Sequence, residues 1–211
     1  MTTRAPRSDA RANRESILAA AREALAQDPR ASIDLIARTA GLSRRALYGH
    51  FDDRAALIDE LIATGAQRFN AIAVTTTSDD PRLDLARLAA RLWHAAEHVQ
   101  LIAAIALDEE HVASTATALG PVRQVLAEIV RRGQTEATLR TDMDAETLAR
   151  IIEEGARTFV DRAPAFSGAR PDVDTASIAV RAVLSLAGLS WREGDELLRT
   201  HPDILAKETD L

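Results

Sequence analysis

The chain has 211 residues and contains no cysteine, which excludes disulfide bonds, thiolate metal sites and cysteine nucleophiles. Hydrophobic residues make up 46% of the sequence but aromatic residues only 3%, and this balance favours alanine- and leucine-rich helices over strands. The sequence has no run of about 18 apolar residues and no signal-peptide pattern, so we expect a cytoplasmic protein without membrane association.

The net charge of −6 is distributed unevenly along the chain. Residues 1–51 carry nine arginines against five acidic residues, a net charge of +4, and the remaining residues carry 17 basic and 27 acidic residues, a net charge of −10. A basic end on an acidic body is expected when only that end meets the phosphates of a nucleic acid.

The first elements in chain order are an arm and a helix. Residues 1–9 are polar and contain Pro6 and two arginines, so we expect a flexible basic arm. Residues 10–27 place apolar side chains at i, i+3 and i+4 spacing, which predicts an amphipathic helix that ends at the Asp-Pro-Arg sequence of residues 28–30.

Residues 32–57 predict two short helices joined by a glycine turn. Ser32 can cap the first helix, Gly41 can adopt the positive φ of the turn, and Ser43 can cap the second helix, which we place at residues 44–50. Two arginines, Arg44 and Arg45, then lie in the first turn of the second helix, where a recognition helix meets base edges. This pattern predicts a helix-turn-helix that reads the major groove of duplex DNA.

The rest of the chain shows helical spacing, with no strand pattern and no internal repeat. Asp52 or Asp53 can cap the next predicted helix, which a linker at residues 75–80 follows. Pro81 begins another helix, a break near 99–101 precedes a short helix to about residue 113, and a further helix runs from Gly120-Pro121 to about Gly133. Asp142 or Asp144 can cap the helix after it, a loop at 164–171 precedes a helix at about 172–187 that ends at Gly188, and a capping box at 190–193 begins the last helix.

The sequence from Ile17 to Leu61 resembles the TetR family of transcriptional regulators, most clearly in IDLIARTAGLSRRALYGHFDDRAALIDEL at residues 33–61. Weaker similarity follows at residues 139–142 and 188–190. The resemblance implies an all-α homodimer of about nine or ten helices in each subunit. It also implies a three-helix DNA-binding domain at residues 10–52 and an effector-binding and dimerisation domain at residues 53–211.

The candidate DNA contacts lie in and around the helix-turn-helix. Arginine can bind guanine or a phosphate through two hydrogen bonds, and the resemblance implies phosphate contacts for the tyrosine, the histidine and the arginine that follow. Each of these roles has an alternative. Arg44 could be a solvated charge, the tyrosine could be a packed aromatic residue, the histidine could be an ordinary surface residue, and the arm could be a disordered tail. The candidates are Ser32, Ser43, Arg44, Arg45, Ala46, Tyr48, Gly49, His50 and Arg54, with Arg4, Arg7 and Arg11 from the N-terminal residues. Arg45 and Gly49 depart from the commoner family pattern, so the operator sequence is not predicted.

The resemblance implies an effector pocket among the fourth to eighth predicted helices. The few aromatic residues indicate an aliphatic lining and therefore a hydrophobic or amphipathic effector. The candidate pocket residues are Trp93, His94, Glu97, Met143 and Phe159.

Two histidines of the predicted pocket region also allow a metal site. His94 and His98 have i, i+4 spacing and could ligate a metal with Asp108, Glu109 or His111. They also continue a polar stripe from Arg87 and Arg91, which favours a solvent-facing surface. We therefore expect no metal.

The resemblance also implies that the last two long helices pair with their copies in a second subunit. The candidate interface residues are Leu148, Ile152, Gly155, Phe159, Ile178, Val180, Val183 and Leu184.

The function expected from these features is that of a ligand-responsive regulator, most often a repressor that leaves a near-palindromic double-stranded DNA operator when a small effector binds. A helical interaction module without DNA binding and an all-α enzyme are the alternatives. The sequence contains no P-loop, no GxGxxG, no HExxH and no nucleophile elbow, so we expect no enzymatic activity and no cofactor.

Overall fold

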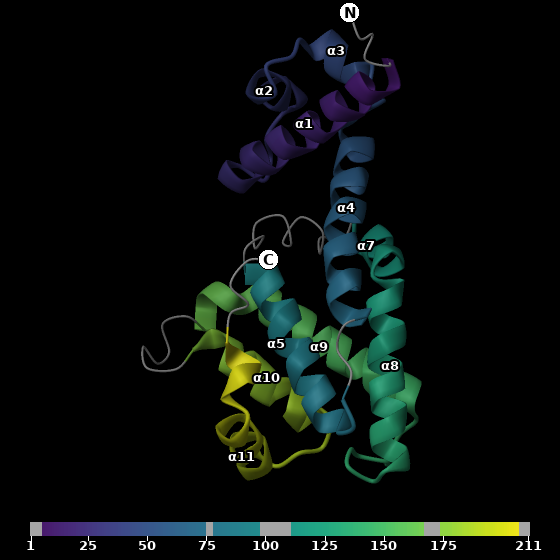
Figure 1. Cartoon of the computed structure of the whole chain (residues 1–211). Helices are drawn as coiled ribbons and strands as arrows, with labels where there is room; N and C mark the ends of the chain where they lie inside the picture. The colour runs from purple at the N-terminus through teal and green to yellow at the C-terminus, as the bar shows by residue number, and fades with distance from the viewer. Residues whose placement is uncertain (1–5, 75–77, 98–110, 167–173, 207–211) are drawn as a thin grey trace, which may run out of the picture.

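The computed structural model describes residues 6–74, 78–97, 111–166 and 174–206, and all the regular structure within these ranges is helical. Figure 1 shows a small N-terminal domain connected by one long helix to a larger helical bundle. The expected all-α fold is confirmed. None of the described helices is long and apolar enough to cross a membrane. The helices are α1 (Pro6–Gln27), α2 (Ile33–Thr39), α3 (Arg44–Tyr48), α4 (Arg54–Val74), α5 (Pro81–Glu97), α7 (Val112–Ala118), α8 (Gly120–Thr135), α9 (Ala145–Phe166), α10 (Thr175–Leu186), α11 (Trp191–Thr200) and the 3-10 helix η1 (Pro202–Leu205).

The N-terminal domain has its own apolar core, made by α1, α2, α3 and the first half of α4. Its fully buried side chains include Ile17, Ile36, Leu47 and Leu57, one from each of the four helices. Burying a side chain of this size stabilises the fold by roughly 1.5–3 kcal/mol. The predicted apolar faces of these helices therefore meet in one core and leave the other face of α3 outside.

Arg14 on α1 links the three parts of this domain. Its Nε donates to Glu60 Oε1 on α4 at 2.6 Å, and its Nη1 donates to the carbonyl oxygen of His50 at 2.6 Å. The guanidinium also lies over the ring of Phe51, 4.2 Å from the centroid. One side chain thus connects α1, the end of the helix-turn-helix and α4.

The second core is formed mainly by α5, α8, α9 and α10, with α10 packed against both α5 and α9. Leu85, Val130, Leu148 and Leu184 are fully buried there. A buried carboxylate joins this core to the linker before α5: Asp84 Oδ2 accepts from Arg132 Nη1 at 3.0 Å, and Arg132 Nη2 donates to the carbonyl oxygen of residue 78 at 2.8 Å.

Several helix ends differ from the sequence prediction. α1 begins at Pro6, inside the segment expected to be a flexible arm, and proline suits a first helical position. α9 continues through Pro164 to Phe166, because a proline in the last turn removes only one backbone donor. The short α7 was not predicted as a separate helix, and no side chain caps its start. The expected break near 99–101 lies outside the described residues.

The end of α8 contains an alanine in the left-handed conformation. Ala137 has φ +55°, the amide of Thr138 donates to the carbonyl of Gly133 at 2.8 Å, and the amide of Ala137 donates to the carbonyl of Gln134 at 3.2 Å. This is the Schellman arrangement, in which glycine normally occupies the left-handed position because a Cβ is disfavoured there.

Ala137→Gly is therefore expected to stabilise the protein. Relief of the left-handed strain, roughly 1–2 kcal/mol, exceeds the extra backbone entropy of glycine, so the free energy of unfolding should rise by about 0.5–1 kcal/mol. Urea unfolding at one fixed protein concentration measures this difference. Ala63→Gly, at an exposed position inside α4, is the matched control and should lose about 1 kcal/mol. Equal losses in both variants would contradict the prediction.

Candidate functional site

The helix-turn-helix is held by local hydrogen bonds. Ser32 Oγ accepts from the amide of Leu35 at 3.2 Å, and Ser43 Oγ accepts from the amide of Ala46 at 3.1 Å, so both predicted caps are confirmed. Gly41 has φ +69°, which a residue with a Cβ adopts only at a cost. These contacts fix the angle between α2 and α3.

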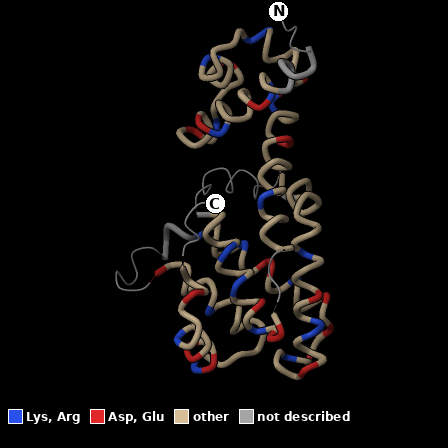
Figure 2. Tube along the Cα trace, in the orientation of Figure 1, with Lys and Arg blue, Asp and Glu red and all other residues tan. Residues whose placement is uncertain are grey.

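The outer face of α3 is polar and exposed. Leu47 points into the core, whereas Arg44, Arg45 and Tyr48 are exposed and His50 is half-buried. Figure 2 shows that α3 places basic residues at the end of the molecule farthest from the C-terminal bundle. The short exposed residues Ala46 on α3 and Gly49 at its C-cap leave the backbone open to close approach.

Arg44 is held by two neighbours in the free protein. Its Nε and Nη1 each lie 3.3 Å from a carboxylate oxygen of Asp34 on α2, and its Nη2 lies 3.5 Å from the hydroxyl of Tyr48. The hydrogen bond to Tyr48 and the charge of Asp34 raise the pKa of Arg44 above its usual value. Exposed ion pairs of this kind are weak, so a DNA phosphate or base can replace Asp34 as the partner.

Arg54 is engaged inside the domain. Its Nη2 donates to the carbonyl oxygen of Pro29 at 2.9 Å, and its Nε donates to that of Ala31 at 3.3 Å. The structure therefore places this candidate DNA contact as a tie between α4 and the loop after α1. Of the three candidate arginines near the N-terminus, Arg4 lies outside the described residues, and Arg7 and Arg11 lie in α1 with side chains that are not described.

We predict that Arg54→Ala destabilises the N-terminal domain. Loss of two hydrogen bonds from a charged donor should lower the free energy of unfolding by roughly 1–2 kcal/mol, because two carbonyl groups lose their partner. Chemical denaturation followed by circular dichroism measures the change. Arg45→Ala, which removes an exposed guanidinium from α3, is the control and should change the stability by less than about 0.5 kcal/mol. Indistinguishable stabilities would show that Arg54 is not a structural tie.

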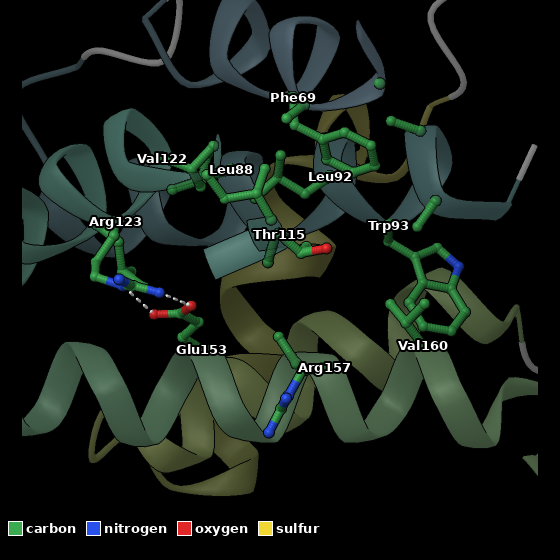
Figure 3. Close-up of a pocket in the computed structure, with 18 of the residues that line it drawn as sticks. Phe69, Leu88, Leu92, Trp93, Thr115, Val122, Arg123, Glu153, Arg157 and Val160 are labelled. Carbon is green, nitrogen blue, oxygen red and sulfur yellow. Dashed lines mark hydrogen bonds and ion pairs between the residues drawn. The ribbon is translucent and has the colours of Figure 1, made fainter. Parts of the chain in front are cut away.

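A cavity of about 520 Å³ lies between α4, α5, α7, α8, α9 and α10. This volume is in the range typical of small-molecule sites, ~300–1,000 Å³. Its wall is mainly aliphatic and aromatic, with contributions from Phe69, Leu88, Leu92, Trp93, Val122 and Val160. Figure 3 shows Trp93 beside Val160 at one end of the cavity and an ion pair at the other end.

The charged side chains of the wall are mostly paired. Arg123 Nη2 and Nε lie 2.5 and 2.6 Å from the two carboxylate oxygens of Glu153, and this hydrogen bonding raises the pKa of Arg123. Arg157 forms an ion pair with Glu154. Arg68 on α4 and Arg22 on α1 complete the charged lining, and both are exposed.

Of the four candidate pocket residues whose side chains are described, Trp93 lines the cavity, and His94, Met143 and Phe159 are not among its lining residues. Phe159 packs against the cluster that contains Trp93, and Met143 packs against the C-terminal core. The side chain of Glu97 is not described. The predicted pocket region included the helix that starts at Gly120, but the candidate residues included none from it, because Val122 and Leu126 of α8 have the spacing of ordinary core residues.

The candidate metal ligands are not assembled by the described residues. His98, Asp108 and Glu109 lie outside the described ranges, and His111 is buried. Within those ranges no group of three or more histidine, aspartate or glutamate side chains could hold a metal ion.

The candidate interface residues divide into two groups. Five are buried inside the protomer, between 0 and 4% exposed, and they face the core rather than a second subunit: Leu148, Ile152, Val180, Val183 and Leu184. Gly155 allows close approach of α10, because a Cβ there would lie 2.5 Å from Leu186 Cδ1. Ile178 and Phe159 are half-buried. The five buried residues face inward because α9 and α10 pack their most apolar faces into the core of their own subunit.

Comparison with known proteins agrees with this architecture. Residues 17–61 match the family model of bacterial regulatory proteins of the tetR family. Similar solved structures include the fatty acid degradation regulator FadR from Bacillus halodurans, with 17% identity, coverage of 89% of this chain and 97% of that chain, and a TM-score of 0.68.

Two further structures have the same fold. FadR from Bacillus subtilis, solved in complex with stearoyl-CoA, has 14% identity, coverage of 82% and 97%, and a TM-score of 0.69. SmeT, the repressor of the Stenotrophomonas maltophilia multidrug efflux pump SmeDEF, has 19% identity, coverage of 82% and 88%, and a TM-score of 0.66. No curated protein gave a significant sequence match.

A capped helix-turn-helix with an exposed basic recognition helix, joined to an all-helical bundle with a cavity, defines a helix-turn-helix DNA-binding regulator. Residues 17–61 are similar to the DNA-binding region of the tetR-family regulators, and most of the chain has the same fold as solved regulators of that family.

Proposed function

We propose that this TetR-type regulator represses transcription from a near-palindromic operator and leaves it when a small hydrophobic or amphipathic effector fills the cavity. The observation that carries the proposal is the position of α4. Its first half is buried in the DNA-binding domain through Leu57 and Ile58, and its second half forms a wall of the cavity through Gly65, Ala66 and Phe69. A ligand that displaces this wall also acts on the recognition helix.

The expected size of the response follows from the thermodynamic linkage between effector binding and DNA binding. An effector that binds the DNA-free conformation more tightly shifts the population toward it, and couplings of ~1–3 kcal/mol are typical. Repression is supported by SmeT, which is described as a repressor, and effector binding is supported by FadR from Bacillus subtilis, which was solved with stearoyl-CoA.

Footprinting of the purified protein on genomic fragments tests the proposal. The expected result is protection of a near-palindromic site that decreases when an effector is added. A protein that protects no site at modest salt, with or without ligand, is not the regulator proposed here.

Within the DNA interface, we assign base reading to Arg44 and Arg45 and backbone contacts to Tyr48 and His50. The two arginines lie at the start of α3, where side chains reach the base edges of the major groove. Tyr48 is 40% exposed with its hydroxyl near Arg44, so it can donate to a phosphate next to the base that Arg44 contacts.

Arg44→Ala and Tyr48→Phe should therefore change DNA binding in different ways. Arg44→Ala should reduce the preference for one base pair roughly tenfold or more, because the bidentate readout is lost. Tyr48→Phe should weaken binding to all sequences alike, because a phosphate contact carries no sequence information. Selection from a randomised operator library measures both profiles. Identical base preferences in the two variants would contradict the assignment.

We place the homodimer contact on the outer faces of α9 and α10. A residue suited to such a contact is apolar or small and is at least partly exposed in a single protomer. Three residues meet this condition: Ile151, which is 40% exposed, and the half-buried Ile178 and Ala182. A twofold dimer would present two recognition helices ~34–36 Å apart, the spacing of successive major grooves on one face of DNA.

Ile151→Glu should shift the protein from dimer to monomer, because it places two like charges near the twofold axis in an apolar contact. Sedimentation equilibrium at micromolar concentration measures the change. Val74→Glu, which alters an apolar residue that is 70% exposed at the end of α4, is the matched control and should remain dimeric. A dimeric Ile151→Glu variant would exclude this face as the interface.

A further inference from the structure

Among the residues that the structure describes, the cavity wall carries more positive than negative charge. Its lining includes four arginines and two glutamates. Arg123 and Arg157 are neutralised by Glu153 and Glu154, as the two ion pairs show. The remaining two arginines, Arg22 and Arg68, form no ion pair in the part of the chain that the structure describes.

The two unpaired arginines lie on the open side of the cavity. Both are exposed, whereas the deeper lining residues Leu85, Leu88 and Trp93 are at most 5% exposed. The cavity is thus cationic toward solvent and apolar inside. A molecule that fits both parts has an apolar body and an anionic end, because an apolar chain gains by burial and an anion gains by meeting arginine.

The two arginines also come from different domains. Arg68 belongs to the half of α4 that forms the cavity wall, and Arg22 is the lining residue that the described part of α1 in the DNA-binding domain contributes. An anionic group near Arg22 therefore contacts the helix that packs directly on α2. Its attraction for Arg22 changes whenever the DNA-binding domain moves relative to the cavity, and this difference is what an effector needs to shift a population.

We infer that the cavity binds an amphipathic anion whose apolar chain lies among Leu88, Leu92 and Trp93 and whose anionic end lies toward Arg22 and Arg68. This inference rests on the proposed effector role of the cavity and adds the chemical class of the ligand. Arg22 is then a positioning residue for the response, since it connects the bound anion to the DNA-binding domain.

Isothermal titration with matched probes tests the ligand class. The probes are octanoate, decanoate and dodecanoate, each compared with the alcohol of the same chain length below its aggregation concentration. We expect affinity to rise about fourfold with each added methylene until the cavity is filled. We also expect each carboxylate to bind at least threefold more tightly than its alcohol. Dodecyl phosphate distinguishes a phosphate end from a carboxylate end, and tight binding of either supports the inference.

Arginine variants test the site. Arg22→Gln and Arg68→Gln should each weaken carboxylate binding about three- to tenfold and leave alcohol binding unchanged. Arg150→Gln removes the same charge from an exposed position on α9 outside the cavity and should change neither. In Arg22→Gln, saturating dodecanoate should also displace less operator DNA than in the parent protein, which a purely structural role of Arg22 would not produce.

The outcomes separate this inference from the proposed function. Equal binding of alcohols and carboxylates, or equal loss in all three variants, overturns the anionic class. Operator binding without any response to these anions also overturns it and leaves the regulator role intact. Failure to bind any operator DNA instead overturns the proposed function.

Discussion

The shared burial of α4 is the constraint on which the rest of the structure depends. The helix has 21 residues and is roughly 30 Å long at 1.5 Å per residue, and it contributes to two separate apolar cores. Leu57, Ile58 and Leu61 are buried among α1, α2 and α3, whereas Ala73 is buried with the C-terminal bundle. Since a packed helix transmits displacement better than it bends, a shift at one end changes the packing at the other.

The contacts around α4 differ in kind between its two ends. At the N-terminal end, Arg14 bonds to Glu60 and Arg54 bonds to two carbonyls of the loop after α1, so α4 moves together with the helix-turn-helix. At the other end, Asn70 Nδ2 donates to the carbonyl of Ala118 at 3.0 Å, and the neighbouring side chains border a cavity. The second half of α4 packs on α5, α7 and α8 and borders the cavity, so a ligand in the cavity can reach it.

The sequence predicted those features whose cause lies within a few residues. The caps at Ser32, Ser43 and Ser190 are hydrogen bonds to amides three residues away, so residue type and spacing are sufficient to predict them. The role of Arg54 was not predictable in this way, because its acceptors are backbone carbonyls 23 and 25 positions earlier. No residue pattern marks a carbonyl that lies within reach only after folding.

The same limit explains the interface and pocket residues. α10 is apolar on most of its faces, so periodicity could not decide which face meets α5 and which meets a second subunit. Val180 and Leu184 were expected at the interface and are buried in the protomer. The cavity forms where the surrounding helices do not fill the space between them, and short residues such as Gly65, Ala89 and Ala116 line it together with larger ones. The sequence pointed to Trp93 as a pocket residue because its side chain is large. It could not show where a cavity remains between packed helices.

The distribution of arginine connects the two halves of the molecule. In the C-terminal bundle, Arg123, Arg131 and Arg132 are bound to acidic residues, so this acidic body offers little attraction to phosphate. In the N-terminal domain, Arg45 is exposed and Arg44 has only a weak exposed partner, which leaves positive charge where DNA would lie. Arg22 and Arg68 at the cavity offset the negative charge of this body locally. Under the proposed ligand class they would therefore provide selectivity for an anion as well as attraction.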